Sequence, residues 1–202
     1  MKKYGSINKL LLICSMLGLL SCDGLYIPDP IDPRIPKYTE NGSDVAGAII
    51  NNICWTSVER FGFLTAKDKP YFISSALTDS LVIQFNGIMG YENTTIEFHL
   101  KGLKIRKFDD LILLKNKKIQ LDGVMNFGVV TDSYLGFSPN ASGMEGVGQI
   151  YFRNVTFDNS SGTVILSGTF GFTETDSSSP ITGVSYGRFD YSLSENSNFR
   201  IQ

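Results

Sequence analysis

The sequence offers few side chains whose type and spacing could support catalysis. His99 is the only histidine among the 202 residues, so it is the most obvious candidate for a general base. It lies between Glu97 and Lys101 in a segment, residues 95–101, that alternates apolar and polar residues. This alternation is typical of a half-buried strand and predicts that His99 lies on the solvated face. One histidine cannot build a His-rich zinc site, so we expect no metal centre.

A nucleophile and a carboxylate pair are the other chemistries to consider. Cys54 lies between Ile53 and Trp55, where a free cysteine usually behaves as a small buried hydrophobic residue. Carboxylates that hydrolyse glycosidic bonds come from separate elements and converge to about 5 to 9 Å. The acids available for such a pair are Glu59, Glu92, Glu97, Asp122, Glu145 and Asp190. No local motif joins two of them, so we assign no catalytic residue and no cofactor, and a carboxylate-dependent hydrolase of glycan or peptide is the alternative hypothesis.

The N-terminus predicts export. Three lysines precede an apolar run, residues 10–20, which is the layout of a secretory signal peptide. The run is too short for a transmembrane helix, which needs about 20 apolar residues. Ser21-Cys22 at its end resembles the lipobox of bacterial lipoproteins, in which signal peptidase cuts before the cysteine and the thiol receives a diacylglycerol. The alternative is an ordinary signal peptide cut elsewhere, with Cys22 a free thiol.

The lipobox implies a membrane-anchored protein with Cys22 as its lipidation site. Two or three acyl chains, palmitate among them, are enough for stable attachment. Residues 1–21 are then the signal peptide, and the expected location is the cell envelope, in the outer membrane, with the periplasmic and surface faces both open. Cys14 leaves with the signal peptide and Cys22 carries lipid, so Cys54 has no disulfide partner.

The mature chain divides into a linker and one domain. Residues 22–44 contain four prolines, Pro28, Pro30, Pro33 and Pro36, which favour an extended polyproline stalk. Residues 45–202 are enough for a single β domain with its own core. Without residues 1–21 the chain has 15 basic and 20 acidic residues, and this negative balance argues against a nucleic-acid partner.

From residue 45 onward the sequence predicts short strands separated by turns, with no long helical period. The expected strands cover residues 45–50, 53–57, 71–76, 81–85, 95–101, 103–106, 111–114, 119–121, 124–130, 134–137, 149–157, 163–172 and 187–193. Asn51-Asn52 suits a two-residue hairpin turn, and Asn86-Gly87 is expected to end its strand. About ten strands without a helical crossover predict a single antiparallel β-sandwich or β-barrel.

Two regions have the composition of binding surfaces. The loops 134–148 and 173–186 contain Tyr134, Asn140, Ser142 and Tyr186, residue types that give adaptable contacts at low entropic cost. Seven basic residues lie between Lys101 and Lys118, where they form a local positive patch in an acidic protein. This patch suits an anionic glycan, lipopolysaccharide or an acidic partner, or it protects an edge strand from aggregation.

Two resemblances complete the sequence interpretation. The motifs Gly148-Gln149-Ile150-Tyr151-Phe152, Ser167-Gly168-Thr169-Phe170-Gly171-Phe172 and Gly187-Arg188-Phe189-Asp190 resemble the C-terminal signature of small uncharacterised lipoproteins of the Bacteroidetes type. The resemblance implies a β fold and an envelope location, and it brings no activity. Asp79-Ser80-Leu81 resembles an O-glycosylation sequon of these bacteria, which implies modification of Ser80. We therefore expect a non-enzymatic binding or structural component of the envelope, with an envelope protein or a glycan as its partner.

Overall fold

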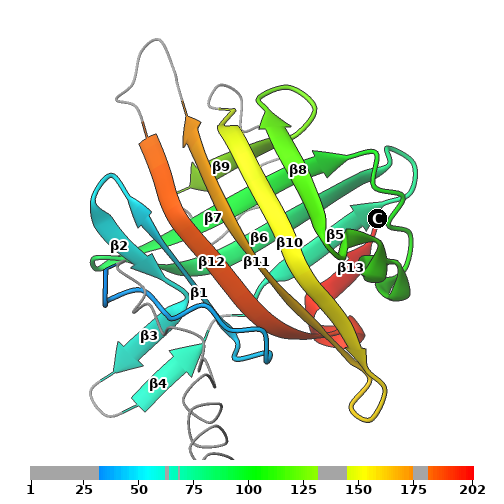
Figure 1. The fold of residues 1–202 in the computed structure, drawn as a ribbon, viewed down its shortest axis with the longest axis horizontal. Coiled ribbons are helices and arrows are strands. Elements are labelled where there is room, and N and C mark those ends of the chain that lie inside the picture. Colours follow the sequence, from blue (N-terminus) through cyan, green and yellow to red (C-terminus); the bar gives the residue numbers. More distant parts are fainter. Residues whose placement is uncertain (1–31, 62–63, 68, 132–144, 175–181) are drawn as a thin grey trace, which may run out of the picture. The chain divides into compact units, whose positions relative to one another are not determined.

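The computed structural model describes residues 32–61, 64–67, 69–131, 145–174 and 182–202, with the backbone alone described from 58 to 67 (Figure 1). The strands are β1 (Val45–Ile50), β2 (Ile53–Thr56), β3 (Val58–Phe61), β4 (Leu64–Lys67), β5 (Tyr71–Ser75), β6 (Ser80–Met89), β7 (Glu92–Lys101), β8 (Lys117–Asp122), β9 (Phe127–Thr131), β10 (Val147–Asp158), β11 (Thr163–Glu174), β12 (Thr182–Ser194) and β13 (Phe199–Ile201). A 3-10 helix, η1 (Phe108–Leu114), and a single helical turn, α2 (Glu195–Asn198), interrupt them.

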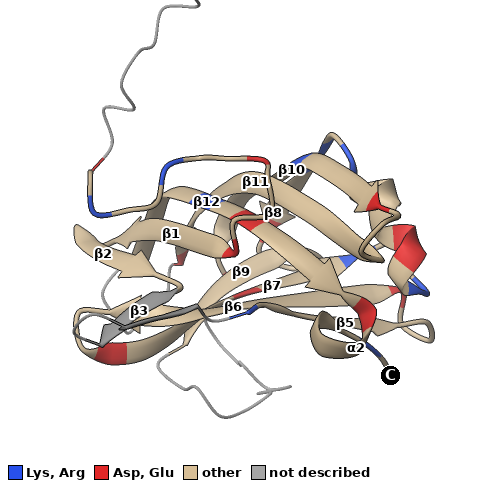
Figure 2. Ribbon diagram, turned by 90° about the horizontal axis from the view of Figure 1, so that it is seen from below, with Lys and Arg blue, Asp and Glu red and all other residues tan. Residues whose placement is uncertain are grey.

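Eleven of the described strands form one curled sheet, and β3 and β4 form a separate hairpin. The order is β13-β5-β6-β2-β1-β12-β11-β10-β8, and β7 pairs with both β6 and β9. Strands β1, β12, β11, β10 and β8 make one layer, called layer A, which faces layer B of β9, β7, β6 and β5 (Figures 1 and 2). An isolated antiparallel bridge between Gly128 and Gly146 joins β9 to the residue before β10. The all-β prediction is confirmed, in the form of an open, curled sheet.

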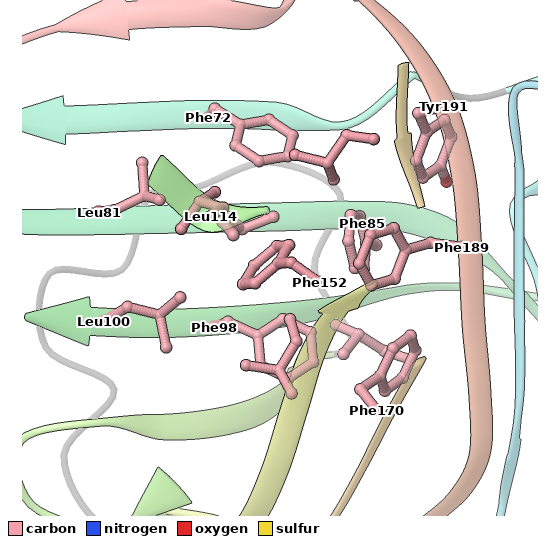
Figure 3. Close-up of a cluster of buried hydrophobic side chains, with 14 of the residues drawn as sticks. Phe72, Leu81, Phe85, Phe98, Leu100, Leu114, Phe152, Phe170, Phe189 and Tyr191 are labelled. Atoms are coloured by element: carbon pink, nitrogen blue, oxygen red, sulfur yellow. The ribbon is translucent and has the colours of Figure 1, made fainter. Parts of the chain in front are cut away.

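Aromatic rings fill the space between the two layers (Figure 3). Phe85 of β6 is fully buried, and its ring centroid lies 5.1 Å from that of Phe189 and 5.6 Å from that of Tyr191, both on β12. Phe98 of β7 meets Phe170 of β11 edge to face at 5.2 Å. Full burial of one such side chain contributes about 1.5 to 3 kcal/mol, so contacts between strands that are distant in sequence make a large contribution to stability.

The predicted first hairpin is confirmed. Strands β1 and β2 pair across Asn51-Asn52, and both turn residues have positive φ, 47° and 69°. Asparagine tolerates this left-handed conformation better than most residues, which explains why two asparagines suit the turn.

The prediction that Asn86-Gly87 ends its strand is wrong, because β6 continues to Met89. Gly87 lies against the buried Trp55, and a Cβ at this position would come within 2.7 Å of the indole ring and 2.5 Å of the Thr56 carbonyl oxygen. The side-chain oxygen of Asn86 accepts a hydrogen bond from Thr95 on β7. The pair therefore serves close packing inside a strand, a known role of strand glycines.

The predicted strands at 103–106 and 111–114 are also wrong. Residues 103–106 have no regular structure, and 111–114 belong to η1. The buried residues of η1 are Phe108, Leu111 and Leu114, a spacing of three that matches the three residues per turn of a 3-10 helix. The Asp110 carboxylate accepts hydrogen bonds from the backbone amides of Arg106 and Lys107 at 2.8 and 3.1 Å and so fixes the start of the helix.

The segment from β10 to β12 follows the sequence prediction most closely, although the two elements after it, α2 and β13, have no predicted counterpart. Strands β10, β11 and β12 are consecutive and antiparallel; β10 and β11 are slightly longer than expected, and β12 begins at Thr182, well before the expected start at Gly187. Strand β9 starts only at Phe127, because the Asp122 carboxylate accepts hydrogen bonds from the amides of Val124, Met125 and Asn126 and holds them in a turn. The strand expected at 134–137 lies outside the described residues.

Residues 32–44, here called the strap, pack against the outer face of layer A. Ile35 is buried, and Pro36 lies so close to β1 that a Cβ on Gly47 would come within 2.4 Å of its ring. Further along, the strap forms hydrogen bonds to Asp190 of β12, and Glu40 pairs with Arg153 of β10 at 3.0 Å. A free spacer of the kind that the prolines predict can therefore include only residues before Asp32.

Candidate functional site

The stems of the two predicted binding loops are neighbours in layer A. Val147, the first residue of β10, pairs with Thr173 near the end of β11, and Thr173 pairs with Gly183 near the start of β12. The described residues on which these loops begin and end therefore lie at the same end of layer A (Figure 1). The sequence could not show this, because cross-strand register sets the pairing.

Two described turns complete this end of the molecule. The β1–β2 turn joins β12 through Asn51, whose backbone amide donates to the Gly183 carbonyl at 3.0 Å and whose side chain accepts from the Gly183 amide at 2.8 Å. The β8–β9 turn joins β10, because Asp122 pairs with Val147. We call the surface formed by residues 51–53, 122–126, 145–147 and 182–183 the loop end.

The described residues of the loop end are apolar and acidic. Val124, Met125, Val147 and Ile53 are 72, 50, 50 and 49% exposed. Asp122 and Glu145 are its charged residues, and the described part contains no lysine or arginine. Exposed aliphatic side chains around a loop cluster are typical of a protein-binding surface.

The sequence-predicted loop residues have different outcomes. Tyr134, Asn140 and Ser142 lie outside the described residues. Tyr186 is described and is 61% exposed, but it belongs to β12 and not to a loop. Its φ of 55° coincides with a shift in register between β12 and its neighbours, so a β-bulge turns the tyrosine outward.

Glu97 and His99 form the most enclosed acid–base pair among the described residues. The Glu97 carboxylate accepts from Gln84 at 3.0 Å and lies 3.3 Å from the His99 ring, which stacks on Phe127 at 4.6 Å. The Glu97 side chain is only 5% exposed and that of His99 is 23% exposed. The expectation of a solvated face is therefore wrong for Glu97, because Gln84 of β6 and His99 of β7 contact its carboxylate.

The other acids considered for hydrolysis have structural roles or separate positions. Asp190 binds the strap, and Asp122 organises the β8–β9 turn. Glu92 starts β7 and Glu145 precedes β10, both exposed, while Glu59 lies in β3, where only the backbone is described. Acidic residues are correspondingly spread over the ribbon in Figure 2. Among the described residues, no three His, Cys, Asp or Glu side chains are grouped so that they could hold a metal ion.

One catalytic motif was not among the candidates drawn from the sequence. Residues Gly183–Gly187 read Gly-Val-Ser-Tyr-Gly, which matches the Gly-x-Ser-x-Gly pattern of α/β-hydrolases. In those enzymes the serine occupies a sharp turn between a strand and a helix. Here the five residues lie inside β12, and the Ser185 hydroxyl donates to the Ile49 carbonyl of the neighbouring strand at 3.4 Å. The local structure therefore does not present Ser185 as a nucleophile elbow does.

Cys54 is half-buried on β2, next to the fully buried Trp55. Burial raises the pKa of the Cys54 thiol, the positive charge of Arg34 lowers it, and the negative charge of Asp32 raises it, with a net increase. The thiolate is the nucleophilic form, so a raised pKa makes the residue less reactive at neutral pH.

We expect Cys54 to react with maleimide several-fold more slowly in the native protein than in denaturant at neutral pH. Labelling followed by mass spectrometry measures the two rates. The native rate should rise as the pH increases past about 8.5, the ordinary thiol pKa. Equal native and denatured rates would show that the fold does not protect the thiol, and a faster native rate would show that it is activated and would restore Cys54 as a candidate nucleophile.

Ser80 is the first residue of β6, directly after the β5–β6 turn, and does not lie in an exposed turn. Its side chain is half-buried, and its hydroxyl lies 2.7 Å from that of Thr78. Glycosylation of Ser80 stays a prediction.

No helix in the described part of the chain is both long and apolar enough to cross a membrane. Comparison of the chain with protein-family models, with curated proteins and with solved structures found no match.

Proposed function

We propose that this protein is an exported lipoprotein of the cell envelope, held in the outer membrane by lipid on Cys22, that binds an envelope partner through the loop end and is not a catalyst. The Ser21-Cys22 lipobox and the resemblance to Bacteroidetes-type lipoproteins support the location. The single observation that supports binding is the adjacency of the two loop stems, each next to exposed aliphatic residues. The partner proposed is a protein or peptide, because Val124, Met125 and Val147 offer apolar contacts and the described surface there has no basic residue.

The absence of a catalytic role is also part of this proposal. The carboxylates whose side chains are described each bind backbone amides, pair with a neighbour or lie on separate elements. The Glu97–His99 pair lies on β7 in layer B, and the loop stems leave layer A. Catalysis requires an activated nucleophile, a phosphate-binding loop or a set of metal ligands, and a binding surface needs none of these.

Cross-linking from the loop end tests the binding proposal. A photoreactive residue in place of Val124 should form a cross-link to one envelope protein, and the same residue in place of Tyr91, which is fully exposed on the β6–β7 turn, should not. The additional substitution Val147→Glu should reduce the Val124 cross-link at least tenfold, because a charge in an apolar contact costs more than 1.4 kcal/mol.

Two results would contradict the proposal. Cross-links that persist in the Val147→Glu variant would place the contact elsewhere. Turnover of a glycoside, ester or peptide that disappears on a Glu97→Gln or Asp122→Asn substitution would instead support the hydrolase hypothesis.

A further inference from the structure

Exposed apolar residues also occur in the β5–β6 turn and on η1. Leu77, in the β5–β6 turn, is 95% exposed. Leu113 and Ile112, on the outer side of η1, are 51 and 39% exposed. The buried side of the same short helix packs into the core through Phe108, which meets Phe199 at 5.8 Å. The two exposed residues of η1 are therefore held outward by a fixed helix.

Hydrogen bonds hold these elements together. The Lys104 amide donates to the Asp79 side chain at 2.7 Å, and the Gly102 amide donates to the Asp79 carbonyl at 2.9 Å. The Asp110 carboxylate then connects residues 106 and 107 to η1. We call residues 77–79 and 102–118 the basic end; Figures 1 and 2 show its elements on one side of the curled sheet.

The basic end is positively charged although the whole chain has a formal charge of −2. Its basic residues are Lys104, Arg106, Lys107, Lys115, Lys117 and Lys118, against three aspartates. Asp79 and Asp110 face backbone amides, and Asp109 pairs with Lys107 at 3.5 Å. No other basic side chain of this region forms an ion pair with a described residue. The positive charge is therefore available to an external anion.

We propose that the basic end is a membrane-contact surface that places Leu77, Ile112 and Leu113 among the headgroups of an anionic bilayer. Protruding aliphatic residues surrounded by lysines match an interfacial membrane site, since the aliphatic groups enter the interface and each nearby lysine gains about 1 kcal/mol from anionic lipid. A soluble polyanion would use the lysines but not the leucines. The loop end has exposed aliphatic residues without basic ones, so the same argument does not apply to it.

Binding to lipid vesicles tests this proposal independently of lipidation and of any envelope partner. The protein used is residues 23–202, which contain every described element and the whole core. Cosedimentation is measured with phosphatidylcholine vesicles and with vesicles that also contain phosphatidylglycerol, at low and high salt. We expect binding to the anionic vesicles only, and weaker binding as salt screens the charges.

Two double variants separate the contributions of charge and apolar contact. Arg106→Gln with Lys115→Gln should weaken binding about thirtyfold, from about 1 kcal/mol per charge. Leu77→Ser with Leu113→Ser should weaken it about tenfold or more, because the aliphatic groups no longer enter the interface. The matched controls are Lys69→Gln, at the opposite end of β5 from Leu77, and Tyr91→Ser, at the opposite end of β6; both should bind as the parent protein does.

Three results would overturn the proposal. The parent protein could fail to bind anionic vesicles, it could bind neutral vesicles equally well, or the leucine variant could bind as tightly as the parent. The last result would indicate that the protein adsorbs to the vesicles through charge alone, which is how it would bind a soluble polyanion. Circular dichroism confirms that the variants are folded, which is expected because the substituted side chains are exposed.

Discussion

Replacement of Cys22 by alanine should move the protein from the membrane fraction to the soluble fraction. The proposed lipoprotein has no other covalent attachment, and two or three acyl chains account for essentially all of its stable anchoring. The β fold should be unchanged, because Cys22 precedes the strap and every described element of the core follows it. Membrane pellets washed in high salt and probed for the protein measure the distribution, and circular dichroism checks the fold.

High salt is needed because the basic end is proposed to contact anionic lipid. Charge-dependent contacts are screened within about 3 Å at 1 M salt, whereas acyl chains stay in the bilayer. The Cys54→Ala variant is the matched control, since it also removes one thiol and should stay in the pellet. Retention of Cys22→Ala in the washed pellet would show that the lipobox interpretation is wrong.

The sequence predicts the fold best where local pattern and tertiary contact agree. Strands β10, β11 and β12 place Phe152, Phe170 and Phe189 in the core, on the side that their alternating pattern predicts, together with aliphatic residues. The Asn51-Asn52 turn depends on the backbone preference of its own two residues, so its position can also be predicted from sequence. For these elements, neighbours that are distant in sequence do not change the type of structure formed.

The predictions fail where a distant partner determines the structure. Gly87 has the signature of a turn, but the Trp55 indole needs the space that glycine leaves. Glu97 has the signature of a solvated residue, but Gln84, His99 and the flanking strands enclose it. The loop end is similar, because its residues come from four separate segments that only the strand register brings together.

The strap is the clearest case, and Asp190 is the residue that holds it. Arg188 and Asp190 alternate with the core residues Phe189 and Tyr191, so their side chains point away from the core. They are nevertheless only 6 and 2% exposed, because the strap covers them. Proline content predicts a free stalk, whereas contacts with distant strands, above all the hydrogen bonds to the Asp190 carboxylate, explain why this segment is bound.

Asp190→Ala should destabilise the protein by about 3 kcal/mol or more. The carboxylate accepts hydrogen bonds from the amides of residues 41, 42 and 43 at 2.8 to 3.1 Å and from the Thr39 and Ser167 hydroxyls. Its removal leaves several buried donors without their acceptor, each at a cost of about 1 to 3 kcal/mol when water cannot replace it. Urea unfolding measures the change. Asp109→Ala, at an exposed side chain, is the control and should change stability by less than about 0.5 kcal/mol.

The same carboxylate should make this stabilisation depend on pH. Burial raises the pKa of Asp190, but the hydroxyl and amide hydrogen bonds outweigh that effect, and the net result is a pKa below the ordinary aspartate value. Because its native pKa is lowered, the Asp190 carboxylate stabilises the fold fully when the pH is above the unfolded-state pKa of about 3.9. This stabilisation is lost as the pH falls through the native pKa. The stability difference between the parent protein and Asp190→Ala should therefore be constant near neutral pH and shrink in acid.

Trypsin should also cleave the strap at Arg34 or Lys37 faster in the variant. A variant with unchanged stability and unchanged cleavage would show that the strap is held by its apolar contacts, with Ile35 and Pro36 against β1, and not by Asp190.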